Sequence, residues 1–210
     1  MLQPLAVVCF AALSLAASLG FFCIFSDVSI HRYALSFAVS TAVVYWSLKR
    51  KSLDVGGAAW AFVVGFILTF ANVTFCVTML TFFVTSSRLT KWRSSSKGKL
   101  SEEEGTQRNH IQVLCNGGLA TLAALLYVWC AGASERHLHW PPQDCSDLSA
   151  LAVLVSLGSV CGDTWASEIG SAVRYGEPRL ITSWRKVPAG TNGGITVIVN
   201  SKFQLLFGWE

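Results

Sequence analysis

The sequence predicts an all-α fold, a bundle of helices that crosses a membrane several times. Of the 210 residues, 52% are hydrophobic and only 13% are charged, whereas about 25% of the residues in an ordinary soluble domain carry a charge. The charges are also separated from the apolar stretches, since residues 88–110 alone hold six of the sixteen Lys and Arg residues. So few charges, separated in this way, are typical of a chain embedded in lipid.

Seven apolar segments and three long polar loops follow one another along the chain, which we treat as a single integral membrane domain. The first segment is long enough to cross a hydrocarbon core of about 30 Å as a helix. A cleaved signal peptide is the alternative there, although no Lys or Arg precedes the apolar run. The apolar segments are about 2–25, 33–48, 57–71, 73–87, 111–132, 148–162 and a partial one at 194–207, and the polar loops are 88–110, 133–147 and 171–192.

Residues 57–86 are uncharged throughout, which is too long a stretch for one span and short for two. The positive-inside rule separates the two interpretations, because each places the polar loops differently. With a single crossing, the polar loops on the two sides of the membrane hold eleven and four Lys and Arg residues. With a turn near Ala71 and Asn72, they hold thirteen and two. The charges therefore favour a short helical hairpin or re-entrant pair at 57–86, with the large basic loop facing the cytosol.

Composition excludes several other classes of protein. The net charge of +4 does not indicate nucleic-acid binding, because the basic residues flank apolar runs and form no stripe among aromatics. Six of the seven cysteines lie in or beside apolar runs, where a thiol behaves as a small hydrophobe. Cys145 lies in a polar loop, and the odd total argues against a closed disulfide framework. No CxxC or Cys/His spacing supports zinc.

Two carboxylates at the end of an apolar segment form the most informative motif, Gly162 to Gly170. Ionisable groups near membrane depth cost a few kcal/mol, so they are retained mainly where a cation, pathway or partner needs them. In a continuous helix, Asp163 would share a face with Ser167, and Thr164 with Glu168. Asp163 and Glu168 are therefore the candidate catalytic residues and Mg²⁺ ligands. The alternative is that Asp163 only caps a helix.

A second motif, from Ser183 to Gly194, joins two cations to a Gly-rich turn. Backbone N–H groups in such a turn form an anion site, to which a lysine adds charge; a plain turn with cations near the membrane is the alternative. Asn116 beside two glycines indicates irregular backbone that lines a cavity, or else a tolerated kink. The candidate substrate-binding residues are Lys91, Asn116, Thr164, Ser167, Lys186, Thr191, Asn192, Gly193 and Gly194.

With these residues in view, the chain resembles the integral membrane family that includes plant phytyl-phosphate kinase. The residues that carry the resemblance are SSRLTK at 86–91, QVLCNGG at 112–118, GDTWASEIG at 162–170 and ITSWRKVPAGTNGGIT at 181–196. The resemblance extends to about Thr196, and full members of the family continue with further spans. It therefore implies a truncated or alternatively ended form of such a protein.

The resemblance implies an enzyme that phosphorylates a prenyl monophosphate at the membrane surface, with CTP as donor and Mg²⁺ as cofactor. A short form lacking part of the site would be inactive. A transporter and a non-catalytic membrane component are the alternatives. The expected partners are the lipid bilayer and an isoprenoid phosphate, with no nucleic acid, and the endoplasmic reticulum is the default location.

Overall fold

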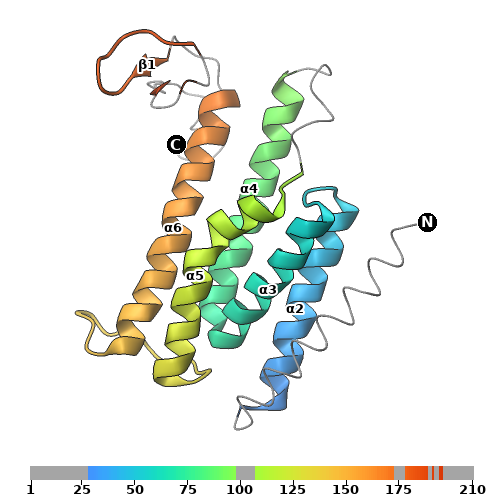
Figure 1. The fold of residues 1–210 in the computed structure, drawn as a ribbon, viewed down its shortest axis with the longest axis vertical. Helices are drawn as coiled ribbons and strands as arrows, with labels where there is room; N and C mark the ends of the chain where they lie inside the picture. The colour runs from blue at the N-terminus through green and yellow to red at the C-terminus, as the bar shows by residue number, and fades with distance from the viewer. Residues whose placement is uncertain (1–27, 98–106, 173–177, 189–190, 192–193, 196–210) are drawn as a thin grey trace, which may run out of the picture.

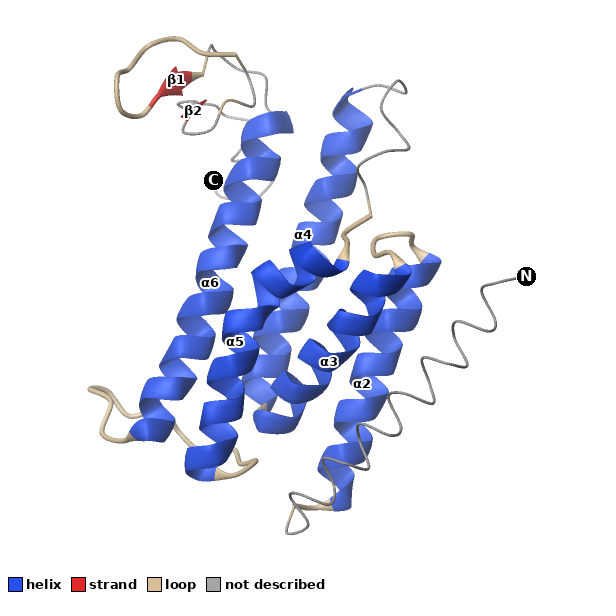
Figure 2. Ribbon diagram, viewed as in Figure 1, coloured by secondary structure: helices blue, strands red, loops and turns tan. Residues whose placement is uncertain are grey.

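The computed structural model describes residues 28–97, 107–172, 178–188, 191 and 194–195. Within them the fold consists of five helices packed side by side and one pair of two-residue strands (Figure 1). Figure 2 shows how completely helix dominates, so the predicted all-α fold is confirmed. The elements are α2 (Ile30–Lys49), α3 (Val55–Ala71), α4 (Val73–Lys97), α5 (His110–Ala131), α6 (Cys145–Ala172), β1 (Arg179–Leu180) and its antiparallel partner β2 (Gly194–Ile195).

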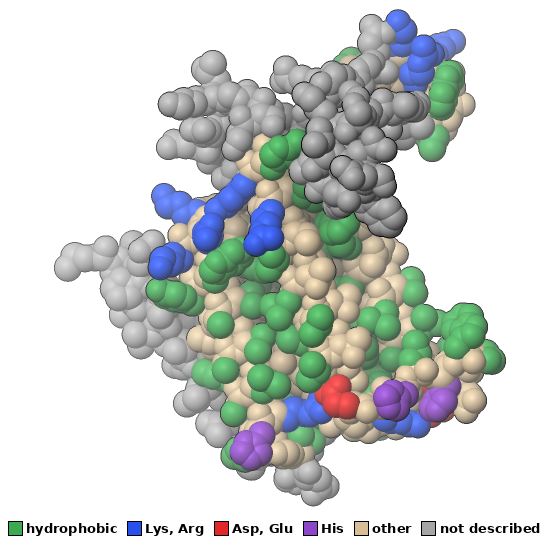
Figure 3. All heavy atoms as spheres, turned by 180° about the vertical axis from the view of Figure 1, so that it is seen from behind, with side chains coloured by type: hydrophobic (Ala, Val, Ile, Leu, Met, Phe, Trp, Pro, Cys, Tyr) green, Lys and Arg blue, Asp and Glu red, His purple; other side chains and the backbone are tan. Residues whose placement is uncertain are grey.

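The outer surface of the bundle is suited to lipid. Three described helices are long and apolar enough to cross a membrane, within Val73–Trp92, His110–Ala131 and Cys145–Ile169, and α3 is a shorter apolar helix. Figure 3 shows hydrophobic side chains over the middle of one face, with charged side chains toward both ends. Along α5 the exposed positions recur every three or four residues and make one apolar side: Ile111, Cys115, Leu119, Leu122, Leu126 and Trp129.

The predicted helical pair at 57–86 is present as α3 and α4, which meet at Asn72. Asn72 is extended, with φ −162° and ψ 141°, and interrupts the helix for a single residue. Its side-chain oxygen accepts a hydrogen bond from the Thr74 N–H at 2.8 Å, and its amide donates to the Ser134 carbonyl at 3.0 Å. A polar side chain that caps a helix therefore defines the turn within a stretch that is otherwise apolar.

The core lies where α3 packs against α2 and α5. Three phenylalanines one turn apart on α3, Phe62, Phe66 and Phe70, stack with ring centroids 6.1 Å apart. The buried face of α2 consists largely of small polar residues, Ser36, Ser40 and Ser47, which let helices approach closely in lipid. A side chain on α5 would be blocked at Gly117, where an added Cβ would lie 2.9 Å from a methyl group of Val64.

Two helices extend beyond the apolar segments that predict them. α4 continues through the first ten residues of the polar stretch 88–110 and ends at Lys97, and α6 continues to Ala172 through the carboxylate motif. Arg, Lys, Gln and Glu are good helix formers, so a change from apolar to polar sequence does not by itself end a helix. The segment 2–25, and the part of 194–207 beyond residue 195, lie outside the described residues.

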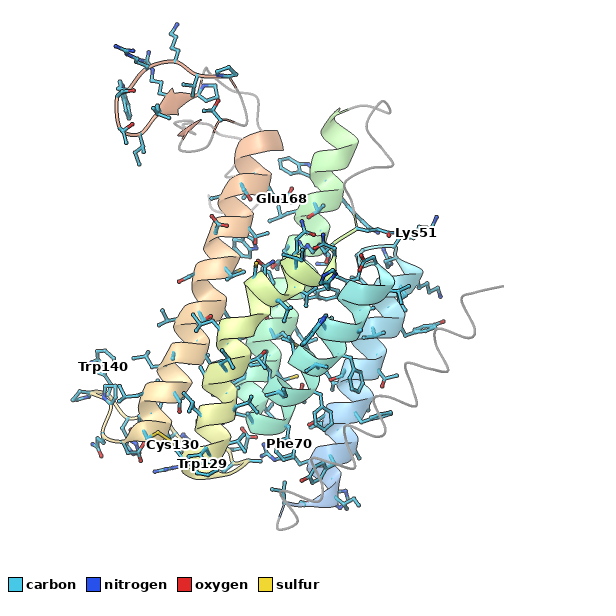
Figure 4. The ribbon with its side chains drawn as sticks, in the orientation of Figure 1. Lys51, Phe70, Trp129, Cys130, Trp140 and Glu168 are labelled. Carbon is cyan, nitrogen blue, oxygen red and sulfur yellow. A yellow bond between two sulfur atoms is a disulfide. The ribbon has the colours of Figure 1, made fainter. Side chains whose placement is uncertain are left out.

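The two ends of the bundle differ in chemistry. One end, which we call the basic end, holds Lys49, Arg50 and Lys51 between α2 and α3, and Figure 4 shows Lys51 and Glu168 in that half of the molecule. The other, the disulfide end, holds the bond between Cys130 and Cys145, whose Cα atoms are 6.0 Å apart. The sequence did not predict this bond, which forms because the fold brings the end of α5 beside the start of α6, while Cys76, Cys115 and Cys161 are free.

Candidate functional site

An apolar cavity of about 60 Å³ lies toward the basic end, and all five helices contribute to its wall. Apart from Arg108 and Asn116, the residues that line it are apolar. An arginine and an amide on such a wall are the kind of groups that fix the orientation of a ligand in a hydrophobic pocket. The remaining lining residues are Val43, Leu53, Ala61, Val64, Met79, Phe82, Phe83, Val113, Gly117 and Leu157.

The backbone of Arg108 is held at both its N–H and its carbonyl by the turn between α2 and α3. Its N–H donates to the Ser52 carbonyl at 3.0 Å, and its carbonyl accepts from the Asp54 N–H at 3.1 Å. Gly57 permits this approach, because an added Cβ there would lie 2.5 Å from the Arg108 carbonyl oxygen. The backbone position of Arg108 is therefore fixed independently of the contacts of its side chain.

The side chain of Arg108 lies against α4. One guanidinium nitrogen donates to the Ser86 hydroxyl at 3.2 Å, and the guanidinium carbon lies 6.0 Å from the centre of the Phe82 ring, within the range of a cation–π contact. Ser86 in turn donates to the Phe82 carbonyl at 2.6 Å. A cation thus lies on an aromatic wall of the cavity, with a hydroxyl beside it.

Between α4 and α6, polar side chains meet at the same end of the bundle. Thr90 donates to a carboxylate oxygen of Glu168 at 3.1 Å, and the Trp165 indole donates to the Thr85 hydroxyl at 3.2 Å. Figure 4 shows Glu168 on the upper part of α6, on the side that faces α4. The segments 86–91 and 162–170, far apart in sequence, are thereby brought into contact.

Arg108 and Glu168 interact through their charges. Burial lowers the pKa of Arg108 from its ordinary value, and the negative charge of Glu168 partly opposes that effect. An arginine keeps its charge in proteins even so. The lowered pKa therefore means that loss of water destabilises this cation, and that a nearby anion would stabilise it.

The four predicted residues of α6 divide between two faces. Asp163 and Ser167 are both exposed, whereas Thr164 and Glu168 are half-buried on the side toward α4. Each i, i+4 pair does share a face, because the helix continues through the motif to Ala172. Asp163 and Glu168 themselves lie five residues apart, about 140° around the axis.

That separation bears on the predicted magnesium site. Among the described residues, no group of three or more His, Cys, Asp or Glu side chains could hold a metal ion. Asp163 and Glu168 do not converge from their different faces of α6. Among the described residues, Asp163 and Glu168 therefore do not form a common Mg²⁺ site, and Glu168 is the one of the two that faces inward.

Of the other predicted substrate-binding residues that the structure describes, Asn116 is the one that lines the cavity. Lys91 is exposed and follows Thr90 on α4. Lys186 is exposed, and its backbone pairs with that of Arg179 in the loop that carries β1, which Figure 1 shows beyond the end of α6. Thr191 donates to the Pro188 carbonyl at 2.7 Å, and Gly194 belongs to β2. Asn192 and Gly193 lie outside the described residues.

The sequence interpretation did not single out Arg108. It stands in a polar stretch with five other basic residues, and nothing in that pattern separates it from them. The available signal was its position directly before the cap of an apolar helix: Asn109 and Gln112 form a capping box at the start of α5. Such a cap fixes where the chain enters the helix, and so fixes the neighbouring residue as well.

Taken together, these features define a class: a multi-pass helical membrane protein with an arginine on the wall of an apolar cavity toward one end. The model of the integral membrane protein family DUF92 matches residues 38–198, and the chain belongs to that family. The matched range includes the cavity and all the contacts of Arg108 and Glu168 described above.

Two relatives give the range of this similarity. Protein PGR of Arabidopsis thaliana is 36% identical over 169 residues, which are 79% of this chain and 58% of the relative. An uncharacterized membrane protein of Methanocaldococcus jannaschii is 27% identical over 150 residues, 71% of this chain and 56% of the relative. The chain thus spans a little over half the length of these curated relatives. No solved structure matches it.

Proposed function

We propose that this chain forms the substrate-binding part of a membrane enzyme that phosphorylates an isoprenoid monophosphate, with CTP as the donor. The observation that supports the proposal is the apolar cavity with Arg108 on its wall, near enough to Glu168 for their opposite charges to interact. A lipid phosphate combines an anion with an apolar chain, and this site offers a cation beside an apolar space.

Phosphoryl transfer suits such a site because its catalysis consists mostly of positioning and electrostatic stabilisation. Arg108 would bind the phosphate of the acceptor and hold it at the mouth of the cavity. Glu168, fixed by Thr90 at 3.1 Å, would help to position the Arg108 guanidinium through its negative charge. Mg²⁺ would neutralise part of the negative charge on the nucleotide phosphates. Because Asp163 and Glu168 do not converge, these two carboxylates would not hold the ion between them. Lys91, exposed and next to Thr90 on α4, would contact the phosphates of the donor.

A transporter receives less support from the same geometry. Transporters typically interrupt their helices near the middle of the membrane, around a central site. The interruption at Asn72 lies at the disulfide end, where its amide contacts Ser134, and α5 continues unbroken through Asn116. A non-catalytic membrane component remains the alternative that activity measurements distinguish.

The proposed orientation places the basic end in the cytosol, in an internal membrane such as the endoplasmic reticulum. Lys and Arg residues prefer the cytosolic side, and disulfides persist on the oxidising side. Lys49, Arg50 and Lys51 lie at one end of the bundle, and the bond between Cys130 and Cys145 lies at the other. The cavity would then lie toward the compartment that holds CTP.

The test is a transfer assay with this chain and, in parallel, the longer Arabidopsis relative. Each is purified in detergent and incubated with geranylgeranyl monophosphate, Mg²⁺ and either CTP or ATP, and the diphosphate product is measured. We expect product with CTP and a loss of at least about tenfold in Glu168→Gln. If neither protein forms diphosphate with either donor, the kinase proposal is wrong.

A further inference from the structure

The cavity is too small for an isoprenoid tail. Each water-sized group needs roughly 10–15 Å³ of such space, so about 60 Å³ accommodates about four to six of them. That is close to the five carbons of one isoprene unit. Anything longer has to leave the cavity and lie among the lipid chains outside the helices.

The polar groups of the wall favour an anion in particular. Arg108 offers a planar set of five N–H donors, which matches the oxygens of a phosphate. One of these N–H groups donates to the Ser86 hydroxyl at 3.2 Å. Among the residues that the structure describes, ion pairs form at Arg32, Arg136 and His139, and none of these pairs includes Arg108. A partly buried cation on an apolar wall is stabilised by an anionic partner.

We propose that Arg108 and Asn116 bind the phosphate of a lipid monophosphate, and that the cavity encloses only the isoprene unit next to it. This inference rests on the proposed function for the class of ligand. It adds which residues recognise the phosphate head group and which part of the isoprenoid tail the cavity recognises. Specificity then comes from the head and the first branched unit, because the rest of the tail exchanges one apolar environment for another.

Binding without nucleotide tests the assignment of Arg108 separately from turnover. Radiolabelled geranylgeranyl monophosphate is titrated against the full chain in detergent micelles, with inorganic phosphate as a competitor. We expect Arg108→Gln to weaken binding at least about tenfold, since it removes charge-assisted hydrogen bonds, and Arg108→Lys to weaken it less. The matched control is Arg50→Gln, which removes an exposed arginine from the same end and is expected to change affinity less than about twofold.

The cavity is tested by filling it and by varying the tail. Ala61→Leu adds three carbons to the wall and is expected to weaken lipid binding several-fold while Arg108 is intact. Geranyl, farnesyl and geranylgeranyl monophosphates, compared at equal mole fraction in the micelle, are expected to bind within about threefold of one another. A steep rise in affinity with each added unit would overturn the inference, because it would mean that the whole tail is bound.

The outcomes separate this inference from the kinase proposal. Binding that depends on Arg108, with no diphosphate formed, supports the head-group site and removes the kinase. Diphosphate formation that Arg108→Gln leaves unchanged supports the kinase and overturns the head-group site. Competition by inorganic phosphate as strong as by the lipid would also overturn it, since the site would then recognise free phosphate. If Arg108→Gln fails to fold, Ala61→Leu and the tail series still decide.

Discussion

Gly117 and Gly118 are neighbours on α5, yet only one of them is required by packing. A Cβ at Gly117 would lie 2.9 Å from a methyl group of Val64 on α3, whereas a Cβ at Gly118 would meet nothing within 4 Å. Val64 is β-branched and stiff within a helix, so it cannot easily give way. The close approach of α3 and α5, which shapes one wall of the cavity, therefore depends on a single missing side chain.

We expect Gly117→Ala to lower the free energy of unfolding by about 1–3 kcal/mol, the usual cost of overpacking. Gly118→Ala is the matched control, and it should be neutral or stabilising by up to about 1 kcal/mol through helix propensity. The measurement is reversible unfolding in mixed detergent micelles. Adding Val64→Ala should restore the stability of Gly117→Ala; equal effects of the two glycine substitutions would contradict the packing argument.

At the scale of helices, the junction of α3 and α4 carries an ion pair that satisfies both helix ends. Arg32 donates to the carbonyls of Phe70 and Ala71 at 3.0 and 3.3 Å, and Glu135 accepts from the Val73 N–H at 3.1 Å. The two side chains also pair at 2.7 Å. A cation at a helix C-terminus and an anion at a helix N-terminus are each favourable, so this pair stabilises the turn at Asn72.

We expect Arg32→Gln and Glu135→Gln to be coupled, with an interaction of roughly 1 kcal/mol in a double-mutant cycle, because Glu135 is 45% exposed and partly screened. The matched control is the pair Arg136 and Asp144, whose side chains are 43% and 44% exposed and which joins no helix break. Its coupling should be smaller. Additive effects of the first two substitutions on unfolding would show that the pair does not stabilise the junction.

At the scale of the whole molecule, the two ends differ in both charge and redox chemistry. The turn after α2 carries three basic residues in a row, and the opposite end carries the disulfide between α5 and α6. These two features are independent of each other, because one follows from composition and the other from the packing of two helices. Both favour the same orientation in the membrane.

We expect a cysteine at Lys51 to react with a membrane-impermeant maleimide on sealed microsomes, whose outer side is cytosolic. A cysteine at His137 should react only after detergent is added. Both residues are exposed, so accessibility to the reagent depends on the side of the membrane alone. Cys76, Cys115 and Cys161, which are free cysteines among the described residues, are first replaced by serine together with Cys9 and Cys23. The reverse pattern of labelling would show that the proposed orientation is wrong.

The sequence by itself determined the class of fold and the position of the turn. Scarce, separated charges require lipid, and the distribution of Lys and Arg placed a turn near Asn72, where α3 and α4 meet. Burial of apolar groups and the energetic cost of charge in hydrocarbon depend on composition along the chain. For that reason they can be predicted without knowing which segments touch.

Only the tertiary structure decided what surrounds the cavity. Arg108 resembles its basic neighbours in sequence, and it becomes distinct because the turn before α3 holds its backbone and α4 receives its side chain. Asp163 and Glu168 read as a pair, yet one is exposed and the other contacts Thr90. These outcomes depend on which face of each helix meets which neighbour, and that is set by contacts between residues far apart in the chain.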